Sequence, residues 1–352
     1  MKLPALFPLV VSAALLLCGC RTVAPELHRF EYTQPQMGVP FRLVLYAPAR
    51  ASADAAAQAA FARIGELNAV MSDYDTDSEL SRLSQTAGQG KTVPVSEELW
   101  RILQRAQQLA SETDGAFDIT SGPFISRWRK ARREGELPDP AKLEQIRSSV
   151  GYDKLRLNAR HHTAELLVPY MRLDLGAIAT GLAVDEALRT LRDRGITRAL
   201  VSGGGDMAVG DPPPGAEGWR IELAPSDLDH APPAEFVLLR NRALATSGDM
   251  FQHVEIGGVR YSHIVDPRTG LGLTDHSLVI VIARDCTTAD SLSTAVSVLG
   301  PESGLRLAER KGACARTIRQ PGAQVEIRQS PCFGRFLSRP KENPHSKPSA
   351  GW

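Results

Sequence analysis

Residues 277–299 read SLVIVIARDCTTADSLSTAVSVL and predict a buried strand followed directly by a helix. The first part, Ser277–Ala283, is an almost continuous β-branched and apolar run, as expected for a strand covered on both faces. The polar residues Asp285–Thr288 supply capping groups, and a helix is expected from about Ala289 to Leu299. This segment therefore predicts a domain that contains both strands and helices.

The rest of the chain repeats this mixture without strict alternation. Further strands are expected at Phe41–Tyr46, Lys154–Leu157, Glu165–Val168, Arg198–Ser202 and Trp219–Ala224. Helices are expected at Ala51–Val70, Glu97–Ser111 and Ile178–Arg194, and the charged span 130–150 is expected to be surface loop plus a short helix. Since no internal repeat and no long linker is visible, the sequence predicts a single α+β domain.

Composition excludes several classes of protein. The 352 residues are 43% hydrophobic and 23% charged, which is ordinary for a globular protein with a substantial core. Lys and Arg total 41 against 40 Asp and Glu, so the net charge of +1 argues against a nucleic-acid-binding protein. With only 6% aromatic residues, stacking platforms for single strands are not expected either.

The first twenty residues predict a targeting segment. Lys2 is the only charge before the apolar run Leu3–Leu17, which has the length of a signal-peptide core and is short for a bilayer span. Leu17-Cys18-Gly19-Cys20 resembles the bacterial lipoprotein box, which implies lipidation of Cys20. We expect an exported protein, lipid-anchored to a bacterial membrane on its periplasmic face. A plain secretory signal or an uncleaved anchor is the alternative.

The domain boundaries follow from this segment and from the other end of the chain. Residues 21–36 are expected to be a short linker or first strand, residues 37–335 the main domain, and residues 336–352 a disordered tail. Export permits disulfides, and Cys314 and Cys332 flank a predicted hairpin. They form either a bridge or two buried free thiols, whereas Cys286 has no evident partner.

Two glycine-bearing segments could contact a ligand. Asp174–Gly181 predicts a turn into a helix, where backbone amides and the helix dipole can hold an anion, or simply a capped turn. Ser202–Asp206 contains three consecutive glycines, which permit close approach of a ligand or a tight turn between strands.

Two other segments carry polar side chains. In Tyr261–Gly270, Arg268 could contact a phosphate and His263 could be a general base or a structural histidine. In Thr287–Thr294, Asp290 and Thr294 are four residues apart on the predicted helix and face the same side. Such oxygen ligands suit Mg²⁺, although the acidic residue could instead complement the helix dipole. The sequence contains no zinc-type His/Cys spacing and no Gly-x-Ser-x-Gly motif.

Taken together and in this order, these segments resemble the ApbE family of FAD:protein FMN transferases. The resemblance extends over roughly Met37 to Phe333, and no single motif decides it. The nine segments that carry it are Met37–Phe41, Met71–Tyr74, Asp77–Leu83, Gly115–Pro123, Asp174–Asp185, Gly203–Asp206, Ala245–Asp249, His263–Gly270 and Ala289–Thr294.

The resemblance implies a reaction, a cofactor and a site. The family transfers FMN from FAD to a Ser or Thr hydroxyl of a partner protein with release of AMP, in a Mg²⁺-dependent reaction. It implies an FAD site between the two halves of the domain, lined by Met37, Tyr74, Ala116, Phe117, Asp118, Asp174, Thr180 and Ile264, with Arg268 supporting the phosphate end. The implied metal ligands are the Ala177 carbonyl, Asp290, Ser293 and Thr294. His263 is the candidate for activating the acceptor hydroxyl, and the implied partner is an acceptor flavoprotein, such as a membrane redox subunit with a Ser/Thr flavinylation motif.

Two departures and two alternatives accompany this interpretation. Thr180 stands where many relatives have Lys or Glu, and Leu182 where the family often has an aromatic residue. Hydrolysis of FAD to FMN and AMP, or a lipoprotein that only binds flavin, would use much of the same site. The intact set Asp290, Ser293 and Thr294 favours an enzyme, because simple flavin binding needs no divalent metal.

Overall fold

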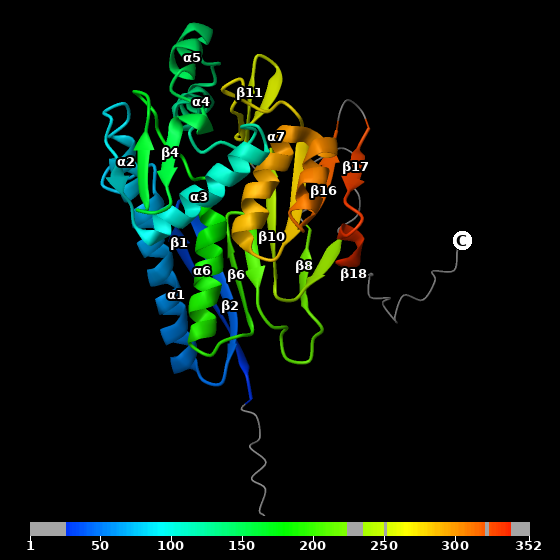
Figure 1. The fold of residues 1–352 in the computed structure, drawn as a ribbon. Coiled ribbons are helices and arrows are strands. Elements are labelled where there is room, and N and C mark those ends of the chain that lie inside the picture. Colours follow the sequence, from blue (N-terminus) through cyan, green and yellow to red (C-terminus); the bar gives the residue numbers. More distant parts are fainter. Residues whose placement is uncertain (1–25, 224–234, 250–251, 321–323, 339–352) are drawn as a thin grey trace, which may run out of the picture.

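An eight-stranded antiparallel sheet forms the centre of the computed structural model, which describes residues 26–223, 235–249, 252–320 and 324–338. Its strand order is β1-β2-β6-β7-β10-β15-β16-β17 (Figure 1). In that order the strands are His28–Gln36, Val39–Ala47, Ala199–Gly203, Asp206–Val209, Arg242–Gly248, Ser277–Ala283, Cys314–Arg319 and Glu326–Gln329. The mixture of antiparallel strands and helices confirms the predicted α+β class.

Three long helices cover one face of this sheet. They are α1 (Arg50–Met71), α6 (Ala179–Asp193) and α7 (Cys286–Arg310), which lie side by side in front of the strands in Figure 1. A three-stranded sheet covers the other face, with order β18-β9-β8 and bounds Leu337–Ser338, Phe236–Leu239 and Trp219–Glu222. In β15, Val279 and Val281 therefore pack toward the helices, whereas Leu278 and Ile280 pack toward the small sheet. Burial on both faces explains the continuous apolar run of this strand.

Smaller elements are attached at the end of the sheet that carries the candidate site. A three-stranded sheet of β3 (Val93–Pro94), β5 (Thr163–Leu166) and β4 (Leu155–Asn158) lies with α2 (Glu79–Ser84) and α3 (Glu97–Glu112). Helices α4 (Gly122–Glu134) and α5 (Pro140–Arg147) and the hairpin β11–β12 (His253–Ile256, Val259–Ser262) lie at the top of Figure 1. A second short hairpin comprises β13 (Val265–Asp266) and β14 (Leu271–Gly272).

Helix α4 was missed by the sequence prediction. Its second residue is proline, which is well tolerated in a first turn, and its buried positions Phe124, Trp128 and Ala131 follow helical spacing. The charged residues from 130 to 134 are thus the last turn of this helix and not part of a surface loop. The expected short helix in the same span is α5.

Two further boundaries were wrong. Helix α7 begins at Cys286 rather than Ala289, because the Asp285 side chain accepts the Thr288 amide hydrogen bond as N-cap. The expected end at Leu299 coincides with a break at Gly300, whose φ of 75° is not helical, and a second helical stretch then continues to Arg310. The predicted tail starts too early, since Leu337 and Ser338 pair with β9 in the small sheet. The remainder of that tail, and the proposed signal segment with Cys20, lie outside the described residues. Among the described residues, no helix combines the length and apolarity needed to cross a bilayer.

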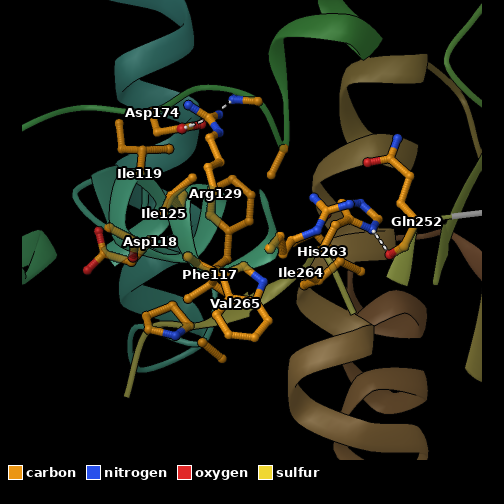
Figure 2. A pocket seen from close by; sticks show the side chains of 18 of the residues that line it. Phe117, Asp118, Ile119, Ile125, Arg129, Asp174, Gln252, His263, Ile264 and Val265 are labelled. Atoms are coloured by element: carbon orange, nitrogen blue, oxygen red, sulfur yellow. Dashed lines mark hydrogen bonds and ion pairs between the residues drawn. The ribbon is translucent and has the colours of Figure 1, made fainter. Parts of the chain in front are cut away.

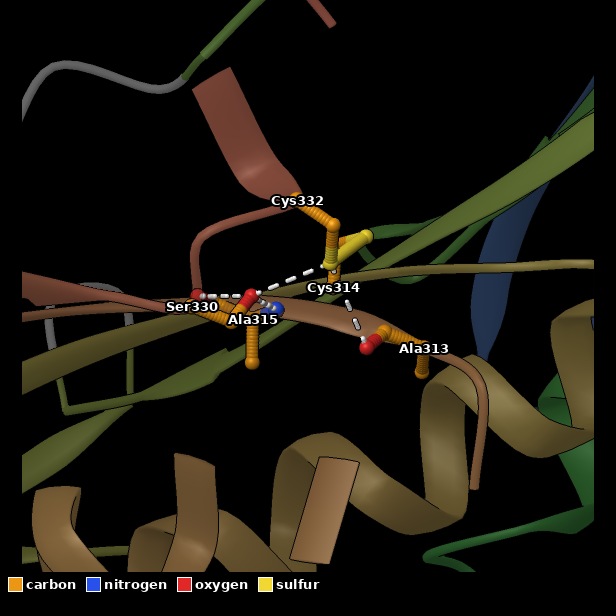
Figure 3. The surroundings of a disulfide bond; sticks show 5 residues. All are labelled: Ala313, Cys314, Ala315, Ser330 and Cys332. Carbon is orange, nitrogen blue, oxygen red and sulfur yellow. Dashed lines mark hydrogen bonds between the residues drawn. A yellow bond between two sulfur atoms is a disulfide. The ribbon is translucent and has the colours of Figure 1, made fainter. Parts of the chain in front are cut away.

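The two cysteines that flank the predicted hairpin form a disulfide. Cys314 begins β16, Cys332 follows β17, and the two strands pair antiparallel, so the bridge closes the end of this hairpin (Figure 3). Beside it, the Ser330 hydroxyl accepts the Ala315 amide hydrogen bond at 2.9 Å. Cys286, by contrast, is a buried free thiol at the start of α7.

Candidate active site

A cavity of about 260 Å³ lies where α4, the segment before α6 and the segment between β12 and β13 meet (Figure 2). Trp128 of α4 helps to hold these parts together, because its indole Nε1 donates to the Ser262 carbonyl at 2.9 Å. On the other side, the Asp174 amide donates to the Ile119 carbonyl at 2.8 Å. The cavity walls therefore come from segments that are far apart in the sequence and are held together by hydrogen bonds.

Nine of the predicted site residues line this cavity. They are Tyr74, Ala116, Phe117, Asp118, Asp174, Ala177, His263, Ile264 and Thr294. The structure adds Trp128, Arg129, Arg132 and Gln252, none of which the sequence singled out, and Ser121 from the segment Gly115–Pro123. The three residues of α4 gave a weak signal because this helix was not predicted, and only a helix brings Arg129 and Arg132 to one face.

Arg129 is the centre of an ion-pair network at one side of the cavity. Its guanidinium donates to Asp73 at 2.5 Å and to Asp174 at 2.8 Å, and lies 4.5 Å from the centroid of the Tyr74 ring. Asp174 also accepts the Gly176 amide hydrogen bond at 2.8 Å. Burial, and then the neighbouring Asp73, raise the pKa of Asp174, which the Arg129 cation opposes. The predicted flavin-site residue Asp174 is thus held in place by a buried pair (Figure 2).

A second group of charges lies at the junction of α6 and α7. The Gly181 amide donates to Oδ2 of Asp290 at 2.9 Å, and a Cβ atom at Gly181 would lie 2.8 Å from the Asp290 Cβ. Glycine is therefore required here so that the two helices can approach. Burial raises the pKa of Asp290 to about 7, against the opposing effect of the Gly181 hydrogen bond.

Two more carboxyl groups lie close to Asp290, of which Asp206 is buried and Asp185 is partly buried. Asp185 accepts hydrogen bonds from the Cys286 and Thr287 amides at 2.7 and 2.8 Å, and so caps α7 from α6. Burial, followed by the nearby Asp290 and Asp185, raises the pKa of Asp206 well above its ordinary value. None of the three makes an ion pair with any residue that the structure describes. This junction is consequently an acidic site that lacks a protein cation.

The donors at this junction fit a hard divalent cation. Asp290 and Thr294 lie one turn apart on α7, Oδ1 of Asp290 has no hydrogen-bond partner in the described part of the chain, and Thr294 and Ala177 line the cavity. One carboxylate, one hydroxyl and one carbonyl oxygen suit Mg²⁺, which usually keeps further positions for water and phosphate. No cluster of three or more His, Cys, Asp or Glu side chains with metal-binding geometry occurs among the described residues, so the protein would contribute a small ligand set.

Ser293 occupies a different position from the other predicted ligands. Its hydroxyl donates to the Asp290 carbonyl at 2.8 Å and contacts the Ser247 hydroxyl of β10 at 2.7 Å. The side chain is fully buried and does not line the cavity. These contacts attach α7 to the central sheet directly behind Asp290.

Comparisons with known proteins show which family the chain belongs to. Residues 37–317 match the ApbE family. The chain belongs to the ApbE family.

Individual ApbE relatives match over most of their lengths. The chain is 31% identical to an FAD:protein FMN transferase of Vibrio cholerae over 94% of this chain and 98% of that protein. It is also 31% identical to an FAD:protein FMN transferase of Escherichia coli, covering 76% of this chain and 78% of that protein. The solved structure of the flavin transferase ApbE from Vibrio cholerae superposes with a TM-score of 0.80 at 29% identity, covering 88% of this chain and all of that chain.

In this member of the ApbE family, His263 has a defined orientation. Its Nδ1 lies 3.3 Å from the Gln252 carbonyl (Figure 2). Because a carbonyl can only accept, Nδ1 carries the hydrogen and Nε2 keeps its lone pair when the ring is neutral. Burial, followed by the positive charge of Arg132, lowers the pKa of His263 from its ordinary value. The ring is therefore prepared to accept a proton at Nε2.

Three predicted flavin-site residues of this ApbE chain lie outside the cavity wall, as do the predicted metal ligands Asp290 and Ser293. Met37 forms the β1–β2 turn with a positive φ of 51° and packs against the main core. Thr180 is in the first turn of α6. Arg268 forms a two-pronged contact with the Asp266 carboxylate at 2.9 and 2.8 Å, and its side chain is 60% exposed. The structure brings none of these three side chains to the cavity surface, and contact with the rest of a long dinucleotide remains a prediction.

Proposed function

We propose that this chain is an Mg²⁺-dependent FAD:protein FMN transferase that is anchored to a bacterial membrane and acts on a Ser or Thr of an acceptor protein. Family membership supports the transferase reaction, because the full-length relatives named above carry this activity in their names. The observation that carries the metal-dependent part is the buried acidic junction of α6 and α7 beside the cavity.

The metal is assigned to Asp290, Thr294 and the carbonyl of Ala177. When bound, Mg²⁺ would neutralise charge on the FAD pyrophosphate. Ser293 is assigned a supporting role, since its hydroxyl already makes two hydrogen bonds and does not line the cavity. The Gly181 amide and the cap by Asp185 hold the Asp290 carboxylate at the start of α7.

His263 is proposed as the general base. The acceptor hydroxyl would give its proton to Nε2 of His263 while its oxygen forms a bond to the flavin-side phosphorus of FAD. The bond from that phosphorus to the bridging oxygen breaks, and AMP leaves with that oxygen. The Gln252 carbonyl orients the ring, and the lowered pKa keeps His263 neutral and able to accept the proton.

The flavin nucleotide is assigned to the cavity and the surface around it. Phe117 and Ile264 supply a buried apolar wall, and Tyr74, with 76% of its surface exposed, offers an aromatic face to a planar ring. Asp118 accepts the amide and hydroxyl hydrogen bonds of Thr120, which fixes its carboxyl group beside Phe117. These contacts would orient the nucleotide with its pyrophosphate toward α7.

A direct test uses the full-length chain purified in detergent with FAD, Mg²⁺ and a purified acceptor domain. We expect mass spectrometry to show addition of FMN to a Ser or Thr of the acceptor and chromatography to show AMP. Release of FMN and AMP with an unmodified acceptor would instead support a hydrolase. Tight FAD binding without turnover in any divalent metal would support a flavin carrier.

The membrane anchor has its own test. Expression in a bacterial host with labelled palmitate is expected to label the mature protein, and Cys20→Ser should abolish both the label and membrane association. Label retained by the Cys20→Ser variant would contradict the assignment of Cys20. The sequence around Leu17–Cys20 supports this proposal, and it does not depend on the active-site residues.

A further inference from the structure

Arg132 is a cationic side chain in the cavity wall that has no anion beside it. It lies three residues after Arg129 on α4, so both guanidinium groups come from one helix face and line the same cavity. Arg129 has two carboxylate partners, Asp73 and Asp174. Arg132 makes no hydrogen bond or ion pair with any residue in the described ranges, and its Nε is buried.

The nearby carboxylates are already used. Asp73 is shared between Arg129 and Arg172, and the Arg172 guanidinium also donates to the Asp73 backbone carbonyl at 2.5 Å. Asp249, on the β10 side, binds Arg260 at 2.6 Å. The residues that the structure describes therefore leave Arg132 without a counter-charge.

The surroundings make this charge unfavourable in the absence of a ligand. Burial lowers the pKa of Arg132, with a smaller contribution from the neighbouring Arg129 cation and against the opposing effect of Tyr74. The charge of Arg132 in turn acts on His263, whose ring also lines the cavity. A buried donor without a partner costs free energy, so a site of this kind is stabilised by an anion that enters with a ligand.

The charge balance of the substrate identifies that anion. A pyrophosphate diester carries one negative charge on each phosphate, and a divalent cation beside Asp290, Asp185 and Asp206 supplies a net charge of at most plus one. At least one positive charge is still required for neutrality, and in the described cavity wall Arg132 is the cation without a partner. Phosphate recognition by arginine is also strong, because the guanidinium offers several donors in a fixed plane.

We propose that Arg132 binds a phosphate group of the nucleotide substrate inside this cavity, beside His263. The proposal rests on the proposed function for the identity of the nucleotide. It assigns to Arg132 a binding role in the ground state, separate from proton transfer by His263 and from metal binding at α7.

Calorimetric titration of the full-length chain without added metal tests this role. The ligands are FAD, FMN, AMP, riboflavin and adenosine, and the variants are Arg132→Gln and Arg132→Lys. Arg133→Gln is the matched control, because Arg133 is the adjacent, exposed arginine and does not line the cavity. We expect Arg132→Gln to weaken FAD binding by roughly 10-fold to 100-fold, as for loss of a charged hydrogen bond.

The phosphate-free ligands decide the interpretation. Binding of riboflavin and adenosine should be unchanged by Arg132→Gln, Arg132→Lys should retain part of the FAD affinity, and Arg133→Gln should change nothing. A selective loss for FMN identifies the flavin-side phosphate, and a selective loss for AMP identifies the adenosine-side phosphate. Unchanged FAD affinity, or an equal loss for the ligands with and without phosphate, overturns the proposal.

These results are distinguishable from failure of the proposed function. Binding is measured without acceptor and without turnover, so a wild-type chain that binds FAD but transfers nothing would refute the transferase and leave the Arg132 result intact. Thermal unfolding of each variant verifies that it is folded. If Arg132→Gln does not fold, the Arg132→Lys variant still tests the proposal. A loss of affinity confined to the ligands that carry phosphate supports it, whereas unchanged FAD affinity, or an equal loss for the ligands with and without phosphate, overturns it.

Discussion

Two charged clusters, one in the cavity wall and one beside the cavity, are organised in opposite ways. At the junction of α6 and α7, the buried Asp206 and Asp290 and the partly buried Asp185 have no ion pair to any described residue. On α4, Arg129 is paired with two carboxylates, whereas Arg132 has no carboxylate partner among the described residues. One cluster therefore lacks a cation and the other lacks an anion, and a complex of a divalent metal with a pyrophosphate would complete both.

Removing the carboxylate at the acidic end should have the largest effect. We expect Asp290→Asn to lower the FMN transfer rate by about 100-fold to 1,000-fold, as for loss of a major electrostatic contact to the transition state. The fold should be retained, because asparagine can still accept the Gly181 amide and removes a buried charge. Transfer rates over a range of Mg²⁺ concentrations measure this effect. Activity within tenfold of wild type would exclude Asp290 as a metal ligand.

The paired arginine should matter for stability more than the unpaired one. Arg129→Ala leaves Asp73 and Asp174 buried without their common partner, and we expect the free energy of unfolding to fall by about 3 kcal/mol. Arg132→Ala should change it by less than about 1 kcal/mol, because no ion pair is broken. Urea unfolding of both variants compares them directly. Equal losses would remove the distinction between the two arginines.

Removal of the Asp185 cap of α7 should have a smaller effect, on both stability and Mg²⁺ affinity. Asp185→Ala removes the acceptor of the Cys286 and Thr287 amides, and we expect a loss of about 2 kcal/mol in stability. Asp290 lies just over one helical turn after Cys286, so the apparent Mg²⁺ affinity in the transfer assay should also decrease. Asp185→Asn should retain part of the stability and part of the Mg²⁺ affinity that Asp185→Ala loses. Asp285→Ala is the control, since it removes the other cap of the same helix from a more exposed position and should leave the Mg²⁺ affinity unchanged.

The pH profile provides the smallest and most specific test. His263 must be neutral to accept a proton, so activity is lost as the pH falls through its pKa, which burial and Arg132 lower below the ordinary value of 6.5. The acidic limb of the profile for the rate at saturating FAD should therefore lie below pH 6.5. Arg132→Gln removes the neighbouring cation and should move this limb toward higher pH. Asp249, whose charge acts in the opposite direction, is unchanged in that variant.

An acidic limb that stays in place in Arg132→Gln would show that Arg132 does not act on the proton acceptor. A His263→Gln variant that keeps the limb would show that another group is responsible. The first result would separate the electrostatic effect of Arg132 from its proposed contact with phosphate.

Much of the fold was accessible from local patterns. The apolar run Ser277–Ala283 is a strand buried between two layers, and Gly195 follows the end of α6 with a positive φ of 80°. Helix α4 was not predicted, because its apolar stripe is narrow and its last turn is rich in arginine. Its position depends on Trp128 reaching the Ser262 carbonyl, a contact between residues 134 positions apart that no local pattern encodes.

By itself, the sequence determined the α+β class, the order of the ApbE segments and nine residues of the cavity wall. Periodicity, capping and motif order are local properties, and they do not depend on how the helices and strands pack together. Only the tertiary structure decided which polar and charged side chains have partners. Asp266 pairs with Arg268, Ser247 contacts Ser293 and two carboxylates pair with Arg129, whereas no described residue pairs with Arg132. Partnership of charges depends on distances between distant segments, and for that reason it could not be derived from residue types and spacing.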